Sequence, residues 1–236
     1  MNKLMMVASA AMIGAMVTGC AAWKEMQEKQ AKEEAAQKAE RAEKGPVRYW
    51  LEKKASPECI AKADQLKPFD PDFREAVEYS VTSYKSEVAN LQKLMVVQDG
   101  VAVWERARAE QSEKVQKEIK DFTAADEQAA YALVTDPKEK QALDAYLKWG
   151  ATLDAQAIEA ARQRNDAFLK SVLKYTTQAK KIAEKFKSNK LKYATAVSDG
   201  LNALNYLSLA GEAATIEADA MAAAKAASGH LKDVAK

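Results

Sequence analysis

Residues 168–186 read FLKSVLKYTTQAKKIAEKF, and this stretch decides the fold class. Its large apolar residues recur at intervals of three, four and seven positions; they include Phe168, Val172, Tyr175, Ile182 and Phe186. Because an α-helix has about 3.6 residues per turn, this spacing puts them on one face. Lysine, threonine and glutamine fill most of the positions between them. The stretch therefore predicts a long amphipathic α-helix.

The same period continues on both sides of that stretch. No segment alternates apolar and polar residues for long enough to predict a β-strand. We therefore predict an all-α protein. The other residues that carry the helical period are Phe73, Val77, Tyr84, Val88, Leu91, Leu94, Val101, Trp104, Val115, Ile119, Phe122, Leu133, Leu143, Leu147, Leu153, Leu201, Leu204, Leu207, Ile216 and Met221.

The predicted helices are long because the 236 residues include only 8 glycines and 5 prolines. If unbroken, the run that contains the quoted stretch would extend for about 75 Å at 1.5 Å per residue. Such helices pack as an elongated bundle or as antiparallel, coiled-coil-like hairpins. Gly150, Gly200 and Gly211 predict either kinks or points where another helix packs closely, and Asp99-Gly100 predicts a kink or a turn.

Three dipeptides mark helix starts, because each places a capping side chain before a proline at the first helical position. They are Ser56-Pro57, Asp70-Pro71 and Asp136-Pro137. We predict a connector over residues 47–70 with one short helix that stops before Pro68. The bundle then covers residues 71–229. Residues 230–236 form a C-terminal tail ending in Lys236, to which we assign no role.

Residues 20–46 are predicted to be a charged tether. Residues 23–44 read WKEMQEKQAKEEAAQKAERAEK, in which glutamates stand four positions before lysines. These pairs favour a solvated helix, each by a few tenths of a kcal/mol. A disordered charged linker is the alternative, because the segment has little apolar surface to bury. Gly45-Pro46 ends it in either case.

The N-terminus has the pattern of a secretory signal peptide. Lys3 is followed by an uncharged apolar run from Leu4 to Val17, and Cys20 stands just beyond it. The run is shorter than the roughly 20 residues that a membrane-spanning helix needs. Residues 1–19 are therefore predicted to be a signal segment.

Residues Val17-Thr18-Gly19-Cys20 resemble the lipobox of bacterial lipoprotein signal peptides, although Val17 replaces the preferred leucine. The resemblance implies cleavage before Cys20, a diacylglycerol on its sulfur and an acyl chain such as palmitate on its amine. Two or more acyl chains anchor a protein stably. Ala21, in place of an inner-membrane aspartate, implies the outer membrane, with either a periplasmic or a cell-surface location. A plain secretory signal ending in cysteine by chance is the alternative.

Charge and cysteine content limit the remaining classes. The formal net charge of +2 gives no argument for a nucleic-acid partner. With Cys20 acylated, Cys59 has no partner for a disulfide within the chain. Cys59 is either a small buried apolar residue or a redox or dimer-linking thiol.

Residues typical of catalysis are scarce. His230 is the only histidine, which excludes a multi-histidine zinc site and a di-iron bundle. No glycine-rich phosphate loop is present. The carboxylates mostly alternate with lysine and arginine, which predicts solvated helix faces. We therefore assign no catalytic, cofactor-binding or metal-ligating residue, and expect a protein that is not an enzyme.

Two further segments carry alternatives. Residues Lys180–Lys192 are rich in lysine around a predicted Ser188-Asn189 turn. They predict either a helix end with favourable charge or a basic tip that contacts anionic lipid, lipopolysaccharide or an acidic protein. Residues 201–228 are rich in small residues, which predicts close helix packing or, alternatively, a membrane-active helix.

The sequence as a whole predicts a bacterial envelope lipoprotein that acts as a structural or partner-binding helical module. Its expected partners are the bilayer, through acylated Cys20, an unidentified envelope protein, and further copies of the same chain. The alternative function is that of a secreted or surface protein, similar to helical pore-forming toxins, that perturbs membranes.

Overall fold

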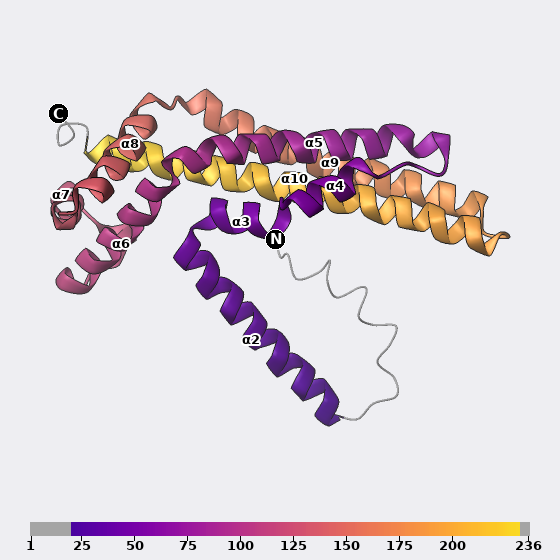
Figure 1. Ribbon diagram of the computed structural model, residues 1–236, viewed down its shortest axis with the longest axis horizontal. Coiled ribbons are helices and arrows are strands. Elements are labelled where there is room, and N and C mark those ends of the chain that lie inside the picture. The colour runs from indigo at the N-terminus through magenta and orange to yellow at the C-terminus, as the bar shows by residue number, and fades with distance from the viewer. Residues whose placement is uncertain (1–19, 232–236) are drawn as a thin grey trace. The chain divides into compact units, whose positions relative to one another are not determined.

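The computed structural model describes the backbone of residues 20–231 and the side chains of residues 29–229 and Leu231. The predicted signal peptide, the side chain of Cys20 and residues 232–236, including Lys236, lie outside the described residues. Every regular element in the described part is a helix, which confirms the all-α prediction (Figure 1). The described chain divides into two units, the first ending at Glu43 and the second beginning at Lys44.

The described part of the first unit is helical, and its helix, α2 (Cys20–Lys44), has its last residue in the second unit. This helix covers the segment interpreted as either a helix or a charged linker. Its described side chains are nearly all exposed. Gly45 follows with a φ of 74°, a left-handed conformation that glycine adopts without steric cost. The prediction that Gly45-Pro46 ends this helix is confirmed.

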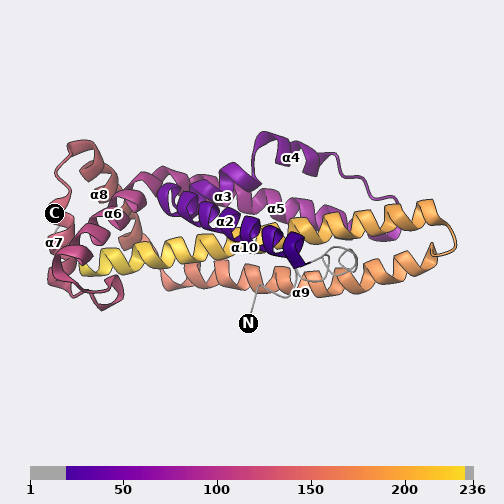
Figure 2. The same ribbon diagram turned by 90° about the horizontal axis from the view of Figure 1, so that it is seen from below.

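The second unit is an α-helical bundle. Its elements are α3 (Pro46–Lys54), α4 (Pro57–Asp64), the 3₁₀ turn η1 (Pro71–Phe73), α5 (Arg74–Leu94), η2 (Met95–Val97), α6 (Gln98–Val115), η3 (Ile119–Asp121), α7 (Ala124–Leu133), α8 (Pro137–Thr152), α9 (Ala155–Lys185) and α10 (Lys190–His230). Helices α9 and α10 form a long antiparallel hairpin, and α5 lies along it (Figures 1 and 2). Helices α6, α7 and α8 pack together beside the C-terminal half of α10.

The three predicted helix starts are confirmed by their caps. Ser56 Oγ accepts a hydrogen bond from the Cys59 amide at 3.3 Å, and Asp70 Oδ1 accepts one from Asp72 at 2.9 Å. Asp136 Oδ1 accepts bonds from the amides of Lys138 and Glu139 at 2.9 and 3.0 Å. Each cap satisfies an amide that has no partner within its helix.

The connector differs from the prediction because it holds two short helices. Pro46 ends the preceding helix and also occupies the first turn of α3. Val47, Trp50 and Leu51 lie on one face of α3 and are buried against α5 and α10. Burial of that face stabilises a nine-residue helix that would be marginal by itself.

The predicted run of about 50 residues is not one helix. Leu153 takes an extended conformation, and Asp154 Oδ1 accepts a hydrogen bond from the Ala157 amide at 2.6 Å to begin α9. Because this cap stabilises a helix N-terminus, beginning the new helix α9 at Asp154 costs less free energy than continuing α8 through it. The chain therefore forms α8 and α9 in place of a single 75 Å helix.

The kink or turn expected at Asp99-Gly100 lies a few residues earlier, at the 3₁₀ turn η2 (Met95–Val97) between α5 and α6, and Gly100 itself lies inside α6. A Cβ atom at Gly100 would stand 2.2 Å from the Ala142 carbonyl oxygen of α8. Gly150 makes the same approach from α8 to α10, where its Cβ would stand 2.1 Å from the Ala224 oxygen. Both glycines allow helix backbones to meet at distances that a side chain would prevent.

Helix α10 is the centre of the bundle and packs against α5, α8 and α9. Its buried face is made mainly of small residues, so neighbouring helices approach closely. These residues are Ala196, Ala203, Ala210, Ala213, Ala214, Ala218, Ala224 and Ala227. Among the described residues, no helix is long and apolar enough to span a bilayer.

Candidate functional site

Three features of the bundle are candidates for a functional site, because each has clustered charges, buried ionisable groups or a cavity. They are the turn between α9 and α10, an ion-paired cluster between three helices, and a cavity beside α6. Only the first was identified in the sequence.

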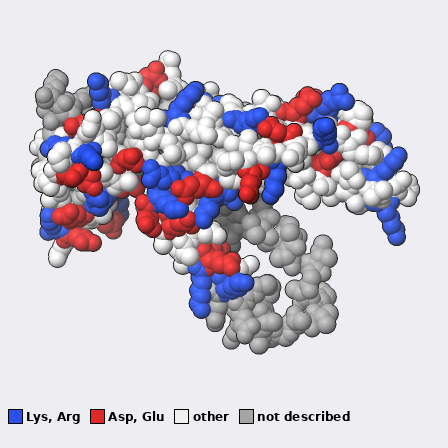
Figure 3. Space-filling model, viewed as in Figure 1, with Lys and Arg blue, Asp and Glu red and all other residues white. Residues whose placement is uncertain are grey.

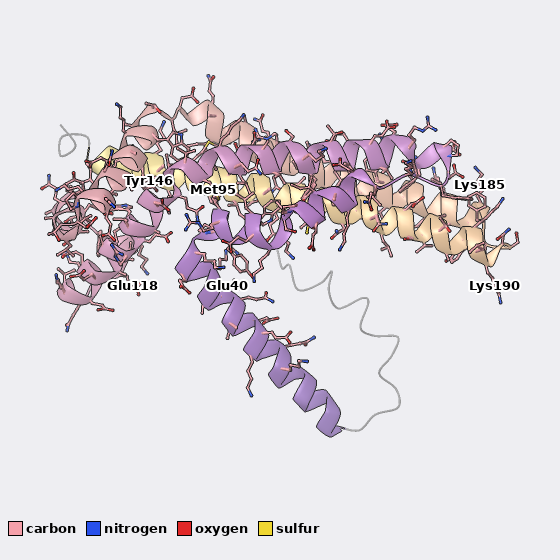
Figure 4. The ribbon with its side chains drawn as sticks, viewed as in Figure 1. Glu40, Met95, Glu118, Tyr146, Lys185 and Lys190 are labelled. Carbon is pink, nitrogen blue, oxygen red and sulfur yellow. The ribbon has the colours of Figure 1, made fainter. Side chains whose placement is uncertain are left out.

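The lysine-rich segment 180–192 forms the end of the α9–α10 hairpin, where Figure 4 labels Lys185 and Lys190. The Asn189 amide donates to the Phe186 carbonyl at 2.8 Å and closes the turn. The Asn189 side chain then accepts a bond from the Lys192 amide at 3.2 Å and begins α10. The predicted turn is therefore confirmed, and it ends a rigid antiparallel pair of helices.

Some of these lysines are neutralised within the bundle. Lys185 Nζ lies 3.0 Å from Asp70 Oδ2 and 3.2 Å from Asp72 Oδ2, which fixes the start of α5 to the end of α9. Burial opposes ionisation of Asp70, but the Asp72 amide and Lys185 together hold the pKa of this carboxyl below its usual value. Lys187 pairs with Glu184 at 3.3 Å.

Other cations at this end project without such partners. Among the described residues, no carboxylate forms an ion pair with Lys180, Lys181 or Lys190. Leu191 and Tyr193 stand beside them with 79% and 40% of their surfaces exposed. Figure 3 shows basic side chains at the end where α9 and α10 meet. We call Lys180, Lys181, Lys190, Leu191 and Tyr193 the tip surface.

The second feature is an ion-paired cluster joining α5, α9 and α10. Arg164 Nε donates to Glu87 Oε1 at 2.9 Å, and its guanidinium also donates to Glu217. Burial, reinforced by the Glu217 charge, raises the pKa of Glu87 although Arg164 opposes the rise. Glu87 is only 1% exposed, so we interpret the cluster as a structural link between the three helices.

The cluster corrects one part of the sequence interpretation. Carboxylates were predicted to lie mostly on solvated faces, yet Glu87 and Glu217 face the inside of the bundle. Glu87 stands three residues after Tyr84 and four before Leu91, so it shares their apolar face. That spacing was the feature of the sequence from which the burial of Glu87 could have been predicted.

The third feature is a cavity of about 380 Å³ that is lined mainly by residues of α6, α8 and α10, with others from α3, α5, η2, η3 and α7. Figure 4 labels Tyr146, one of its wall residues. The walls are mainly apolar and aromatic. They include Val47, Val97, Val101, Trp104, Ile119, Phe122, Tyr146, Trp149, Ala220, Ala223 and Ala227.

A few polar groups line the same cavity. Arg108 donates to Glu127 Oε1 at 2.7 Å, and its guanidinium carbon lies 5.8 Å from the ring centres of both Trp104 and Phe122. Burial raises the pKa of Glu105 although Arg108 opposes the rise. Burial, with the charge of Glu105, also raises the pKa of Tyr146.

Three fully buried polar atoms of residues that line the cavity make no hydrogen bond to any described residue. They are Gln98 Oε1, Trp104 Nε1 and Arg108 Nε. Gln98 is held in place through its other end, because Nε2 donates to the Lys44 carbonyl at 2.6 Å. In the sequence, Trp104 was recognised only as one of the residues that carry the helical period, and nothing indicated that a cavity would form beside it.

The remaining sequence-selected residues are placed as follows. Cys59 is half-buried on α4 with a free thiol. His230 is the last residue of α10, and its side chain is outside the described set. Within the described part of the chain, no three potential metal ligands gather in one place. Comparison with known protein families, with curated protein sequences and with solved structures finds no match.

Proposed function

We propose that this protein is a bacterial envelope lipoprotein, anchored through acylated Cys20, whose helical bundle serves as a structural or partner-binding module. The observation that carries the proposal is the lipobox-like segment Val17-Thr18-Gly19-Cys20 after a short apolar run. Lipid on Cys20 attaches the chain to the bilayer surface without a spanning helix. The host membrane is the outer membrane, on either its periplasmic or its cell-surface face.

The form of the bundle supports a role in binding. The α9–α10 hairpin is a stiff projection, since α9 has 31 residues and α10 has 41. It ends in the tip surface, where cations stand beside exposed apolar side chains. Cations and apolar groups side by side favour an acidic protein surface as the partner, because charge steers the encounter and apolar burial holds the complex.

The membrane-active alternative involves residues 201–228. This segment forms most of α10, with Ala203, Leu207, Ala210 and Ala214 buried against α5 and α9. Close packing accounts for its small residues. Insertion into a bilayer would require these contacts to break and Glu212 and Glu217 to enter the hydrocarbon region. Leakage of dye from liposomes by the unlipidated protein would favour this alternative.

Cross-linking in the native host tests the binding role. A photo-reactive phenylalanine analogue is placed at Leu191 on the tip surface or, as a control, at Leu173 in the middle of α9. The two leucines are matched, with 79% and 71% of their surfaces exposed. We expect a specific adduct from position 191 and none from position 173. Equal labelling from both positions would contradict binding through the tip surface, and an adduct of twice the protein's mass would identify a second copy as the partner.

A further inference from the structure

The cavity beside α6 is large enough for a small organic molecule. Its volume of about 380 Å³ falls within the range of roughly 300–1,000 Å³ that small-molecule sites occupy. All the residues that line it belong to the second unit. Most of its wall is apolar, which favours a ligand with an apolar body. The charged side chains on the wall then select the charge of that ligand.

The positive charges on the cavity wall are already compensated within the protein. Arg108 pairs with Glu127, and Lys120 pairs with Glu118, each at 2.7 Å. An anionic ligand would have to displace one of these carboxylates before either cation could receive it. The existing ion pairs therefore disfavour an anion in this cavity.

Two carboxylates on the wall are not compensated in the same way. Glu105 on α6 and Asp219 on α10 both line the cavity, and neither forms an ion pair with any residue that the structure describes. Both residues are exposed, so a molecule entering from solvent can reach them. Partial burial raises the pKa of the Glu105 carboxyl, although Arg108 opposes the rise. A carboxylate that has lost part of its hydration gains more from a bound cation than a fully solvated one does.

Aromatic rings form part of the same wall. Phe122 and Trp149 line the cavity, and each is only half-buried. The face of an aromatic ring attracts a cation within about 6 Å of its centre. Arg108 already uses this attraction, since its guanidinium carbon lies 5.8 Å from the centre of the Phe122 ring. Aromatic rings also pack against one another in offset or edge-on arrangements, so the wall suits a cation that carries a ring.

We propose that this cavity binds a monovalent organic ammonium ion with a compact aromatic body, of which an arylalkylamine is the simplest case. The ammonium group lies at the carboxylate of Glu105, and the negative charge of Asp219 adds to its attraction. The aromatic body packs against Phe122 and Trp149. This inference goes beyond the proposed function and does not depend on it.

Isothermal titration of the purified full chain carrying Cys20→Ala, which cannot be lipidated at that position, tests the proposal. The probes are tryptamine, tryptophol and indole-3-propionate, which share an indole ring on a short chain and are cationic, uncharged and anionic, respectively. We expect saturable 1:1 binding of tryptamine, binding at least tenfold weaker for tryptophol, and the weakest binding for indole-3-propionate. Equal or tighter binding of either other probe, or no saturable binding of tryptamine up to about 1 mM, would overturn the proposal.

Glu105→Gln tests the charge while keeping the size of the side chain. It should weaken the binding of tryptamine about tenfold and leave the binding of tryptophol unchanged, because only the cation uses the carboxylate. Glu113→Gln is the control, since it makes the same change at an exposed position of α6 that does not line the cavity. Equal effects of the two substitutions on tryptamine affinity would mean that Glu105 does not receive the ammonium group, and would overturn the proposal.

A bulky substitution on the wall locates the binding. Ala223→Phe adds bulk at an exposed position that lines the cavity and should abolish the binding of tryptamine. Ala194→Phe puts the same side chain at an exposed position of α10 outside the cavity and should leave binding unchanged. Tryptamine binding that is the same in Ala223→Phe, Ala194→Phe and the parent protein would show that the amine associates elsewhere and would overturn the proposal.

Discussion

Arg164 on α9 donates a hydrogen bond from Nε to Glu87 Oε1 on α5 at 2.9 Å, although the two residues are 77 positions apart in the chain. The same guanidinium reaches Glu217 on α10, so one side chain links the three helices at the centre of the bundle. A buried charge needs a partner, and the observed alignment of the three helices supplies one. We infer that this cluster selects the register in which α5, α9 and α10 pack.

Replacement of Arg164 by methionine should destabilise the bundle strongly, because it leaves Glu87 buried without its cation. Loss of one partner from a fully buried pair costs about 3–5 kcal/mol, and partial exposure of Arg164 reduces the expected loss to about 2 kcal/mol. Urea denaturation at pH 7 measures the change. Arg162→Met, at an exposed position two residues earlier, is the control. Equal effects of the two substitutions would contradict the role of the cluster.

The stability contributed by Glu87 should depend on pH. Its pKa is raised by burial, so the folded state binds this proton more tightly than the unfolded state does. The free energy of unfolding should therefore fall as pH rises from the unfolded-state pKa, about 4.3, through the raised folded-state value. Glu87→Gln removes this titration. Denaturation curves between pH 4 and 8 should show the parent protein losing stability relative to the variant, and the opposite slope would mean a lowered pKa.

Gly150→Ala should disturb the contact between α8 and α10. The added Cβ would stand 2.1 Å from the Ala224 oxygen, so one helix must move away. Overpacking of this kind costs about 1–3 kcal/mol, and the rigid backbone on the other side favours the upper end. Thermal melting measures the change. At Gly229 a Cβ would have no atom within 4 Å, so Gly229→Ala should leave stability unchanged or slightly raised.

Charge reversal on the tip surface should reduce partner capture without unfolding the protein. Lys181 and Lys190 are exposed, and their replacement by glutamate removes the cations that attract an acidic surface. We expect the yield of the adduct from position 191 to fall at least fivefold at physiological salt. Lys138→Glu with Lys148→Glu applies the same charge change to exposed positions of α8. A similar loss of adduct in this control would attribute the effect to net charge alone.

The sequence predicted the parts of the fold that depend on local signals. Ser56, Asp70 and Asp136 cap helices where their proline dipeptides indicated, since a cap is formed by residues adjacent in the chain. The break at Asp154 was missed because an apolar period runs across it and no proline marks it. Gly100 was interpreted as a kink or turn because its packing against Ala142 is a tertiary contact.

The candidate sites differ in the same way in how far the sequence could predict them. The lysine-rich tip was visible in the sequence because its residues are consecutive. The cavity depends on the distances between α6, α8 and α10, so no single segment could reveal it. Glu87 and Arg164 lie between these cases: the apolar spacing around Glu87 indicates burial, but its partner stands on another helix.

Mass spectrometry of the protein from the membrane fraction of its native host would show directly whether Cys20 is the membrane anchor. We expect a chain that begins at Cys20 and carries a diacylglycerol and an additional acyl chain on that residue. A Cys20→Ala variant should lack the lipid and leave the membrane fraction. A mature, soluble chain without lipid would contradict the proposed anchor and favour a secreted protein.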